Sequence, residues 1–421
     1  MYQKVTLDNG INILTEELPH VRSVAIGFFV DVGSRDETEE ISGVSHFIEH
    51  LMFKGTDKRS AKDIAETLDA VGGQLNAFTT KEFTCYYARV LDEHFDLAVD
   101  VLSDMFFNSK FDQQDIERER NVILEEIKMY EDAPDELVHD IFARSMWNGH
   151  ALGRPIIGTA GVIANITREQ IIDYYHKYYD PSKLIVAVAG NIEHNRVVNK
   201  LQPVLERKKS NHSNRKLVLP TPHRDVVCRS KDTEQVHLCI GTPGLKLNDD
   251  NYYVLQVINT ILGGGLSSRF FQEIREQRGL VYTVFSYHTS YHDAGLFCIY
   301  AGLSKENIDE VLELVLKQIW DIQNNGCSKE ELQRAKDQLK GNLYLSLENV
   351  STRMSRLGKS QLYLGQVMPP EEIVNLVNKV QGEDIQALAS EMLKPENFSL
   401  ATIGPWEDCG NLKKALDGLW N

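Results

Sequence analysis

Apolar and polar positions follow two rhythms along the chain, one with the period of a strand and one with the period of a helix. Short apolar runs at 23–32, 84–90 and 184–189 have the length and residue types of buried strands. Longer segments with helical spacing lie between them. Strands and helices do not alternate strictly. The pattern therefore favours an α+β fold, in which helices pack mainly on one face of a mixed or antiparallel sheet.

The same succession of elements occurs twice. Residues 171–190 have the pattern of a helix, a break at Pro181 and a strand, and residues 385–404 repeat that pattern with Pro395 at the same place. A self-similar spacing of this kind indicates a duplicated unit. We therefore expect two homologous domains.

A second pair of segments supports the duplication. Residues 95–126 and 308–342 both have the pattern of a helix, a short polar break and a second helix. The two halves meet in a polar, charged and proline-containing stretch, which is typical of a linker. The predicted boundaries are 1–208 for the first domain, 209–223 for the linker and 224–421 for the second domain.

A five-residue motif, His46-Phe47-Ile48-Glu49-His50, stands out for its chemistry. On a helix, positions 46, 49 and 50 emerge on one face. Two neutral imidazoles on that face can bind Zn²⁺, and the carboxylate beside them can hold a zinc-bound water. The apolar residues around the motif suit the buried side of such a helix.

A second helical pattern, Glu117 to Glu126, is rich in carboxylates. Glu119 and Glu126 are two helical turns apart and share a face. One of them can ligate the metal while the other supports the site from outside. The spacing alone does not decide which does which.

Longer stretches of the sequence resemble the pitrilysin/insulinase metallopeptidases, in particular the branch of the mitochondrial processing peptidases and their bacterial relatives, whose inverted zinc motif is His-x-x-Glu-His. The resemblance covers nearly the whole chain. It rests on LDNGINILTEELP, GSRDETEEISGVSHFIEHLMFKGT, VGGQLNAFTTKEFTCYY, RERNVILEEI and FQEIREQRGLVYTVFS.

This resemblance implies a role for each residue of the motif region. It implies one zinc ion per chain, held by His46, His50 and Glu126. Glu49 becomes the general base that activates a zinc-bound water, and Glu119 becomes the supporting carboxylate.

The resemblance also implies how substrate binds. It makes Asn76, Ala77, Phe78 and Thr79 an edge strand, to which an extended peptide adds as a further strand. Glu136 and Asp140 match positions that hold a substrate arginine in processing peptidases. Carboxylates one helical turn apart are also common on exposed helix faces, so the sequence leaves both interpretations open for this pair.

Arg275 and Tyr282, in the second half, match a pair that family members use to bind substrate and stabilise the reaction from the opposite half of the enzyme. Relatives with four domains supply this pair from the fourth domain to the zinc site of the first. A chain with two domains is therefore expected to form a homodimer, in which the pair acts on the partner's zinc. The second domain itself is expected to bind no zinc.

Composition narrows the class of partner. The formal net charge of −16 argues against nucleic acid, whose phosphates attract basic surfaces, and it suits cationic substrates or simply keeps the protein soluble. No apolar run approaches the ~18 residues of a membrane helix. The first residues lack the apolar core of a signal peptide and the arginine-rich character of a presequence, so we expect a cytoplasmic protein.

The predicted function is that of a zinc-dependent endopeptidase, which hydrolyses short or unfolded peptides enclosed in a dimeric chamber. One alternative is a non-catalytic structural or substrate-binding subunit of the same fold. Another is a regulatory metal-binding module, which would keep the metal ligands but would not need Glu49.

Overall fold

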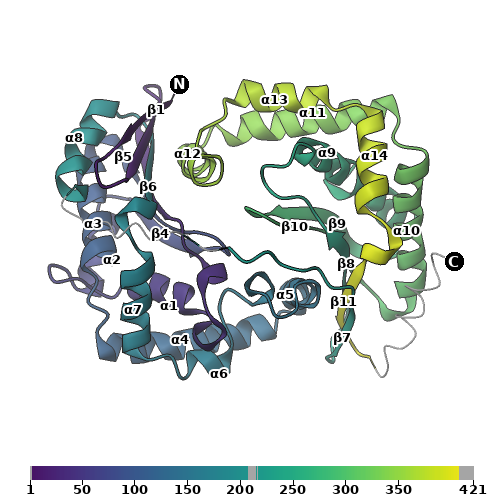
Figure 1. Cartoon of the computed structure of the whole chain (residues 1–421), viewed down its shortest axis with the longest axis horizontal. Coiled ribbons are helices and arrows are strands. Elements are labelled where there is room, and N and C mark those ends of the chain that lie inside the picture. The colour runs from purple at the N-terminus through teal and green to yellow at the C-terminus, as the bar shows by residue number, and fades with distance from the viewer. Residues whose placement is uncertain (1, 207–214, 216, 407–421) are drawn as a thin grey trace. The chain divides into compact units, whose positions relative to one another are not determined.

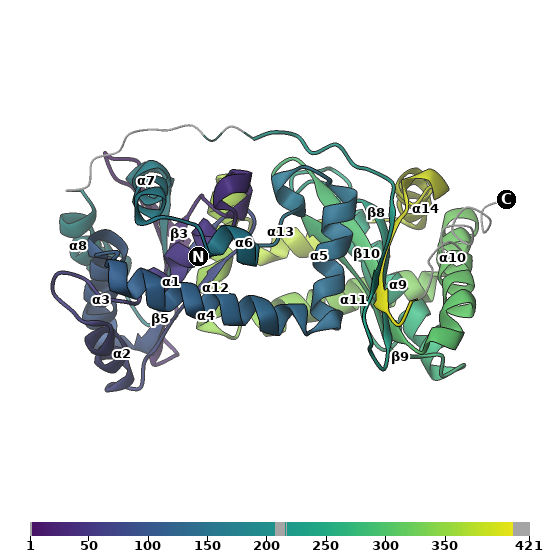
Figure 2. The ribbon, with the colours of Figure 1, turned by 90° about the horizontal axis from the view of Figure 1, so that it is seen from below.

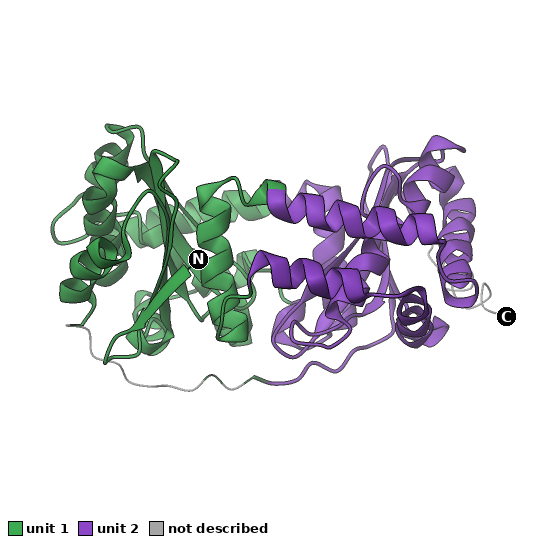
Figure 3. Ribbon diagram, turned by 90° about the horizontal axis from the view of Figure 1, so that it is seen from above, with its two compact units in different colours: residues 1–128, 154–217, 345–368 green, residues 129–153, 218–344, 369–421 purple. Residues whose placement is uncertain are grey.

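The computed structural model describes residues 2–206, 215 and 217–406. Two compact units divide the chain, each made from separate stretches of sequence (Figure 3). The first unit contains residues 1–128, 154–217 and 345–368, and the second contains 129–153, 218–344 and 369–421. Within the described ranges, no helix is both long and apolar enough to cross a bilayer.

The first unit is built on a six-stranded mixed sheet with the order β1-β2-β6-β3-β5-β4. Strand β2 pairs parallel with β6, and all the other neighbours in this sheet are antiparallel. The strands are β1 (Tyr2–Thr6), β2 (Asn12–Glu17), β3 (Ser23–Val30), β4 (Gln74–Thr79), β5 (Thr84–Leu91) and β6 (Leu184–Gly190).

The second unit repeats this topology in a five-stranded sheet with the order β7-β11-β8-β10-β9. Strand β7 pairs parallel with β11, as β2 does with β6, and the remaining pairs are antiparallel. The strands are β7 (Val226–Ser230), β8 (Val236–Pro243), β9 (Val281–Ser290), β10 (Gly295–Leu303) and β11 (Ser399–Gly404). The matching order confirms the predicted α+β fold and its duplication.

The helices follow the same repeat. In the first half they are α1 (Val44–Leu51), α2 (Ala61–Asp69), α3 (Phe95–Asn108), α4 (Gln113–Glu131), α5 (Pro134–Met146), α6 (Ala160–Ile163), α7 (Arg168–Tyr178) and α8 (His194–Leu205). In the second half they are α9 (Tyr252–Gly263), α10 (Ile308–Asn324), α11 (Lys329–Ser346), α12 (Val350–Leu364), α13 (Pro370–Lys379) and α14 (Gly382–Met392).

The two faces of the first sheet bury alternate residues of each strand. On β3, Ile26 and Phe28 join the core formed with α3, whereas Ala25 and Phe29 face the other way and pack against Met354 of α12. Figure 1 shows α3 and α8 on one side of this sheet and α12 on the other. Most of the helices thus cover one face, as predicted, and a single helix covers the second.

The second sheet is covered in the same way, again by a helix from the other half of the sequence. Ile240 and Ile299 pack in the core with α9 and α10, while Cys239 and Cys298 join a cluster with Phe142 of α5. Figure 2 shows α5 against the strands on the side away from α10. The two repeats therefore exchange helices, α5 for α12.

This exchange makes the compact units differ from the contiguous segments expected from the repeat. Residues 129–153 pack with the second sheet and 345–368 with the first. The boundaries 1–208, 209–223 and 224–421 remain a prediction about the duplicated sequence. Residues 1, 207–214, 216 and 407–421 lie outside the described residues.

Candidate metal centre and peptide-binding edge

Helix α1 carries the central motif and has one buried and one polar face. Val44, Phe47, Ile48 and Leu51 are buried in the first core. The helix begins after Gly43, whose φ of +98° is accessible to glycine and strained for other residues. A Cβ at Gly43 would lie 2.7 Å from the carbonyl oxygen of Ile157. This close approach fixes where the helix starts.

A buried carboxylate holds the first turn of α1. Glu37 Oε2 accepts a hydrogen bond from the Gly43 N–H at 2.7 Å, and its Oε1 accepts one from the Ser45 N–H at 2.8 Å. These donors have no partner within the helix, and a carboxylate satisfies them while facing the positive end of the helix dipole. Burial nevertheless raises the pKa of Glu37 to about 7, although both backbone hydrogen bonds oppose the rise.

The structure brings the three predicted zinc ligands together. His46 Nε2 lies 3.8 Å from Glu126 Oε1, and His50 Nε2 lies 3.6 Å from Glu126 Oε2. One ligand atom from each of the three residues lies within 4.8 Å of the others. Helix α1 supplies the two histidines and α4 supplies the carboxylate. As expected from their spacing, the two histidines of the motif share one face of a helix.

Glu119 occupies the supporting position rather than the ligand position. Its Oε2 lies 3.1 Å from His50 Nδ1, and its Oε1 lies 2.8 Å from Lys54 Nζ. A hydrogen bond from Nδ1–H to this carboxylate leaves the His50 Nε2 lone pair directed at Glu126. Lys54, which follows the end of α1, is not among the predicted site residues.

The chemistry of this donor set fits a zinc ion. Zinc takes imidazole nitrogens and carboxylate oxygens at about 2.0–2.2 Å, which places tetrahedral ligand atoms roughly 3.5 Å apart. The nitrogen–oxygen separations of 3.6 and 3.8 Å are close to this value. Burial, followed by the effect of His50, lowers the pKa of His46 to about 4. His46 is therefore a neutral imidazole at neutral pH, the form that binds a metal.

Glu49 lies beside this cluster and is not one of its ligands. Burial is the main reason that its pKa is raised, and a hydrogen bond from the Thr79 hydroxyl opposes the rise. A carboxylate with a raised pKa is a better proton acceptor near neutral pH than an ordinary exposed one. Thr79 was predicted to bind substrate, and the structure additionally places its hydroxyl on Glu49.

The segment predicted to receive a peptide is indeed at a sheet edge. It lies in β4, the last strand in the order of the first sheet. The Ala77 N–H is bonded to the Asn76 side-chain oxygen at 2.8 Å. The Phe78 ring packs edge-on against Phe83 and Tyr87. Strand β4 is thus supported on one side by β5 and is unpaired on the other within the described part of the sheet.

The remaining predicted residues belong to the second unit. Arg275, in a π-helical turn (Phe271–Glu276), places its guanidinium carbon 6.0 Å from the centroid of the Tyr282 ring. Tyr282 itself is 72% exposed. The structure therefore brings this pair together on the surface of its own unit.

Glu136 and Asp140 both lie on α5, the helix that covers the second sheet. Glu136 is exposed and Asp140 is half-buried. Burial and the neighbouring Asp140 raise the pKa of Tyr130, which hydrogen-bonds to the Asp140 side chain. One member of the pair thus already has a partner within the chain, and the other faces solvent.

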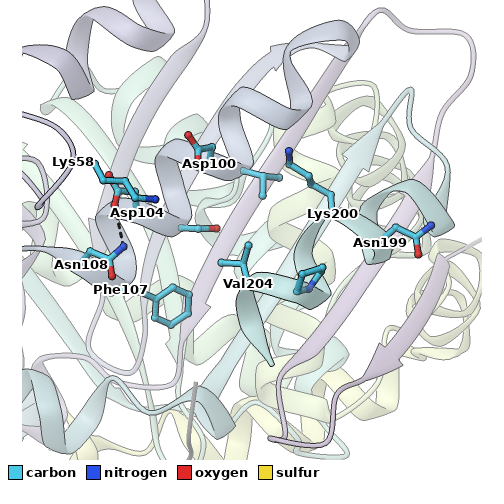
Figure 4. Close-up of a pocket in the computed structure, with 11 residues that line it drawn as sticks. Lys58, Asp100, Asp104, Phe107, Asn108, Asn199, Lys200 and Val204 are labelled. Carbon is cyan, nitrogen blue, oxygen red and sulfur yellow. Dashed lines mark hydrogen bonds between the residues drawn. The ribbon is translucent and has the colours of Figure 1, made fainter. Parts of the chain in front are cut away.

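A cavity of about 500 Å³ lies away from these residues, in the first unit between α3 and α8 (Figure 4). Its lining includes both cationic and anionic side chains. Asp104 accepts hydrogen bonds from Thr56, Arg59 and Asn108. Because the hydrogen bonds of this buried carboxylate are made within the chain, the cavity is a weaker candidate for a functional site than the histidine cluster.

Comparison with known proteins identifies the family. The model of the insulinase family, peptidase family M16, matches residues 12–160, and that of the peptidase M16 inactive domain matches 165–339. The chain is 44% identical over 405 residues to an uncharacterized zinc protease of Bacillus subtilis, covering 96% of this chain and 98% of that one. It is 42% identical over 416 residues to an uncharacterized zinc protease of Streptomyces coelicolor, covering 96% and 90%.

Solved structures show the same fold. A protease from Helicobacter pylori aligns with a TM-score of 0.88 and 21% identity, covering 96% of this chain and 100% of that one. A peptidase M16 inactive domain from Pseudomonas fluorescens aligns with a TM-score of 0.90 and 20% identity, covering 96% and 98%. The sequence relatives, together with the shared architecture, lead to one conclusion: the chain belongs to the pitrilysin/insulinase family of peptidases, peptidase family M16.

Proposed function

We propose that this chain is a zinc-dependent endopeptidase with His46, His50 and Glu126 as the metal ligands. The observation that carries the proposal is the convergence of these three side chains beside the half-buried carboxylate of Glu49, which does not belong to the ligand set. Zinc bound there would polarise the scissile carbonyl and make a water molecule more acidic. The names of the relatives, zinc proteases, point to the same metal.

Glu49 performs the proton transfers in this proposal. Its carboxylate takes a proton from the attacking water and passes it to the leaving amine of the cleaved peptide. The Thr79 hydroxyl, bonded to Glu49 Oε2, fixes the orientation of the carboxylate. Thr79 ends β4, so the strand that receives the peptide also positions the base.

Substrate is held through its main chain. An extended peptide adds to the open edge of β4 and pairs with backbone groups, which requires little of the substrate sequence. This mode of binding selects short or unfolded peptides, because a folded protein offers no free extended strand. Glu136 and Asp140 are proposed to favour a basic residue of the substrate, in keeping with the acidic chain.

The second unit completes the site in trans. Arg275 and Tyr282 are proposed to contact the substrate of a partner subunit, so the working enzyme is a homodimer that encloses the peptide. The exposure of Tyr282 and its proximity to Arg275 support a shared outward-facing role. Both groups can donate hydrogen bonds to the oxygen that gains charge during hydrolysis.

The decisive experiment uses Glu49→Gln. The variant should keep its zinc, measured by elemental analysis, and should lose at least about a hundredfold in kcat toward a fluorogenic peptide, as expected when a general base is removed. If the variant cleaved peptide as fast as the unsubstituted chain, Glu49 would not be the base. If the unsubstituted, zinc-loaded chain cleaved no peptide, a non-catalytic subunit of the same fold would be the better description.

A further inference from the structure

A second group of metal-ligating side chains lies in the second unit, on the sheet face that α5 covers. His139 comes from α5, Cys239 from β8 and Cys298 from β10. In the register of β8 and β10, Cys239 lies opposite Tyr300, two residues from Cys298. Residues two apart on a strand share a face, so both thiols are directed at α5.

The ligand atoms of this group are close to one another. Cys239 Sγ lies 3.3 Å from His139 Nδ1, and one atom from each of the three residues lies within 4.8 Å of the others. The Cys298 side chain hydrogen-bonds to Cys239, His139 and Tyr287. The Tyr287 hydroxyl lies 2.8 Å from His139 Nδ1. The polar atoms of these four side chains, which come from three strands and one helix, therefore lie close together.

The surroundings are those of a structural site. Cys239 and Cys298 are free thiols with no exposed surface, and they belong to a cluster with Phe142 and Trp147. His139 is half-buried. An apolar lining excludes competing water, and two thiolates would balance the charge of a divalent ion there.

We propose that His139, Cys239 and Cys298 form a second metal site for a thiophilic cation of the zinc class, with Tyr287 beside the fourth position. A tetrahedral zinc ion with sulfur at about 2.3 Å and nitrogen at about 2.0 Å holds those two atoms roughly 3.5 Å apart. The separation of 3.3 Å between Cys239 Sγ and His139 Nδ1 already approximates this geometry. The ion would tie α5 to β8 and β10.

The site has a role distinct from catalysis. A buried ion held by one helix and two strands would link α5, the helix that the first repeat contributes, to strands β8 and β10 of the second sheet. Such an ion stabilises the folded state because its ligands are brought together only there. The proposal does not depend on the peptidase activity or on the histidines of α1.

Cobalt(II) distinguishes the two sites, because only a thiolate ligand gives an intense near-ultraviolet charge-transfer band. We would titrate the full-length His46→Ala/His50→Ala variant, in reduced form, with cobalt and then with zinc. The expected result is a thiolate–cobalt band that saturates at about one equivalent, disappears when zinc is added, and is absent when Cys298→Ser is also introduced.

A second variant, His139→Asn, keeps the side chain near its original size and should weaken zinc binding about ten- to a hundredfold, measured by competition with a chromogenic chelator. If Cys298→Ser did not fold, the test would rest on the cobalt titration of the His46→Ala/His50→Ala variant, which keeps His139, Cys239 and Cys298. No charge-transfer band and no bound zinc in the His46→Ala/His50→Ala background would overturn the proposal and leave a hydrogen-bonded thiol–imidazole cluster.

Discussion

His50 and Glu119 form a pair in which one ring nitrogen contacts the carboxylate at 3.1 Å while the other nitrogen faces Glu126. Glu119 is only 6% exposed, so little water competes for this contact. The pair therefore sets the orientation and the tautomer of a proposed zinc ligand from outside the ligand set.

Replacing Glu119 with Gln should weaken zinc binding by about ten- to a hundredfold, because the amide keeps the size of the side chain and loses its charge. Zinc affinity measured against a competing chelator would check this. Glu125→Gln is a matched control on the same helix, since Glu125 is exposed and pairs only with Lys128 among the described ion pairs. Equal affinities for the two variants would contradict the role given to Glu119.

Gly43→Ala should be more harmful than an ordinary glycine replacement. A left-handed backbone alone costs an alanine about 1–2 kcal/mol. At Gly43 the added Cβ also meets the Ile157 carbonyl, and forced overpacking adds about 1–3 kcal/mol. Gly72 has a φ of +67°, and no atom lies within 4 Å of the place that a Cβ would take, so Gly72→Ala isolates the backbone cost. Urea midpoints should fall further for Gly43→Ala, and zinc content should fall only there.

Glu37 should give folding stability a measurable pH dependence. Its pKa rises from 4.5 in the unfolded chain to about 7 in the folded one, so the folded state binds more protons between these values. Stability from this group is fully present below about pH 4.5 and is lost as pH rises through about 7, by at most about 3 kcal/mol. In Glu37→Gln, this pH-dependent loss of folding stability should be absent, because the amide does not titrate.

Unfolding curves of the unsubstituted chain and of Glu37→Gln, compared from about pH 5 to pH 8, would show the effect as a difference in slope. The amide can accept only one of the two backbone hydrogen bonds, so the variant should also be less stable at the low end of the range. Parallel curves would mean that Glu37 keeps an ordinary pKa in the fold.

The open edge of β4 can be tested with a proline. Ala77→Pro removes an N–H that donates a hydrogen bond to the Asn76 side-chain oxygen. If peptides pair with this edge, kcat/KM should fall about five- to thirtyfold, the equivalent of about 1–2 kcal/mol, while zinc content stays the same. Asn76→Ala should act in the opposite direction and lower KM, because it frees the same N–H. Unchanged kinetics in both variants would exclude pairing at Ala77.

Mixing two inactive chains tests the shared site. A Glu49→Gln chain supplies Arg275, and an Arg275→Ala chain supplies Glu49. In a random mixture of exchanging dimers, half are mixed and each mixed dimer has one complete site, so about a quarter of the unsubstituted rate should return. As the control, a Glu49→Gln/Arg275→Ala chain replaces the Glu49→Gln chain in the mixture. This mixture should recover no activity. No recovery despite proven mixed dimers would place Arg275 outside the partner's site.

Much of the fold was accessible from the sequence because its signals are local. The apolar runs became β3, β5 and β6, and the repeated helix–break–strand spacing became α7 with β6 and α14 with β11. The start of α11 is equally local, because Ser328 and Glu331 are three residues apart and form the two reciprocal hydrogen bonds of a capping box. Each of these depends on residues a few positions apart.

The parts that escaped prediction depend on distant residues. Glu37 caps α1 from a loop, and no spacing rule connects a carboxylate six residues before Gly43 with the helix it supports. The exchange of α5 and α12 is also invisible locally, because an amphipathic helix shows that it packs on a sheet without showing which sheet. Cys239 and Cys298 meet His139 only through strand register and helix packing, which sequence spacing does not contain.

The exchange of α5 and α12 sets the order in which the chain can finish folding during synthesis. All strands of the first sheet are synthesised well before α12. Until α12 is made, the sheet face that bears Ala25 and Phe29 has no covering helix. A product truncated before α12 would keep that apolar face uncovered, a surface that chaperones bind and that proteases reach. Quality control can therefore recognise an unfinished copy of this protein by a face that only the complete chain conceals.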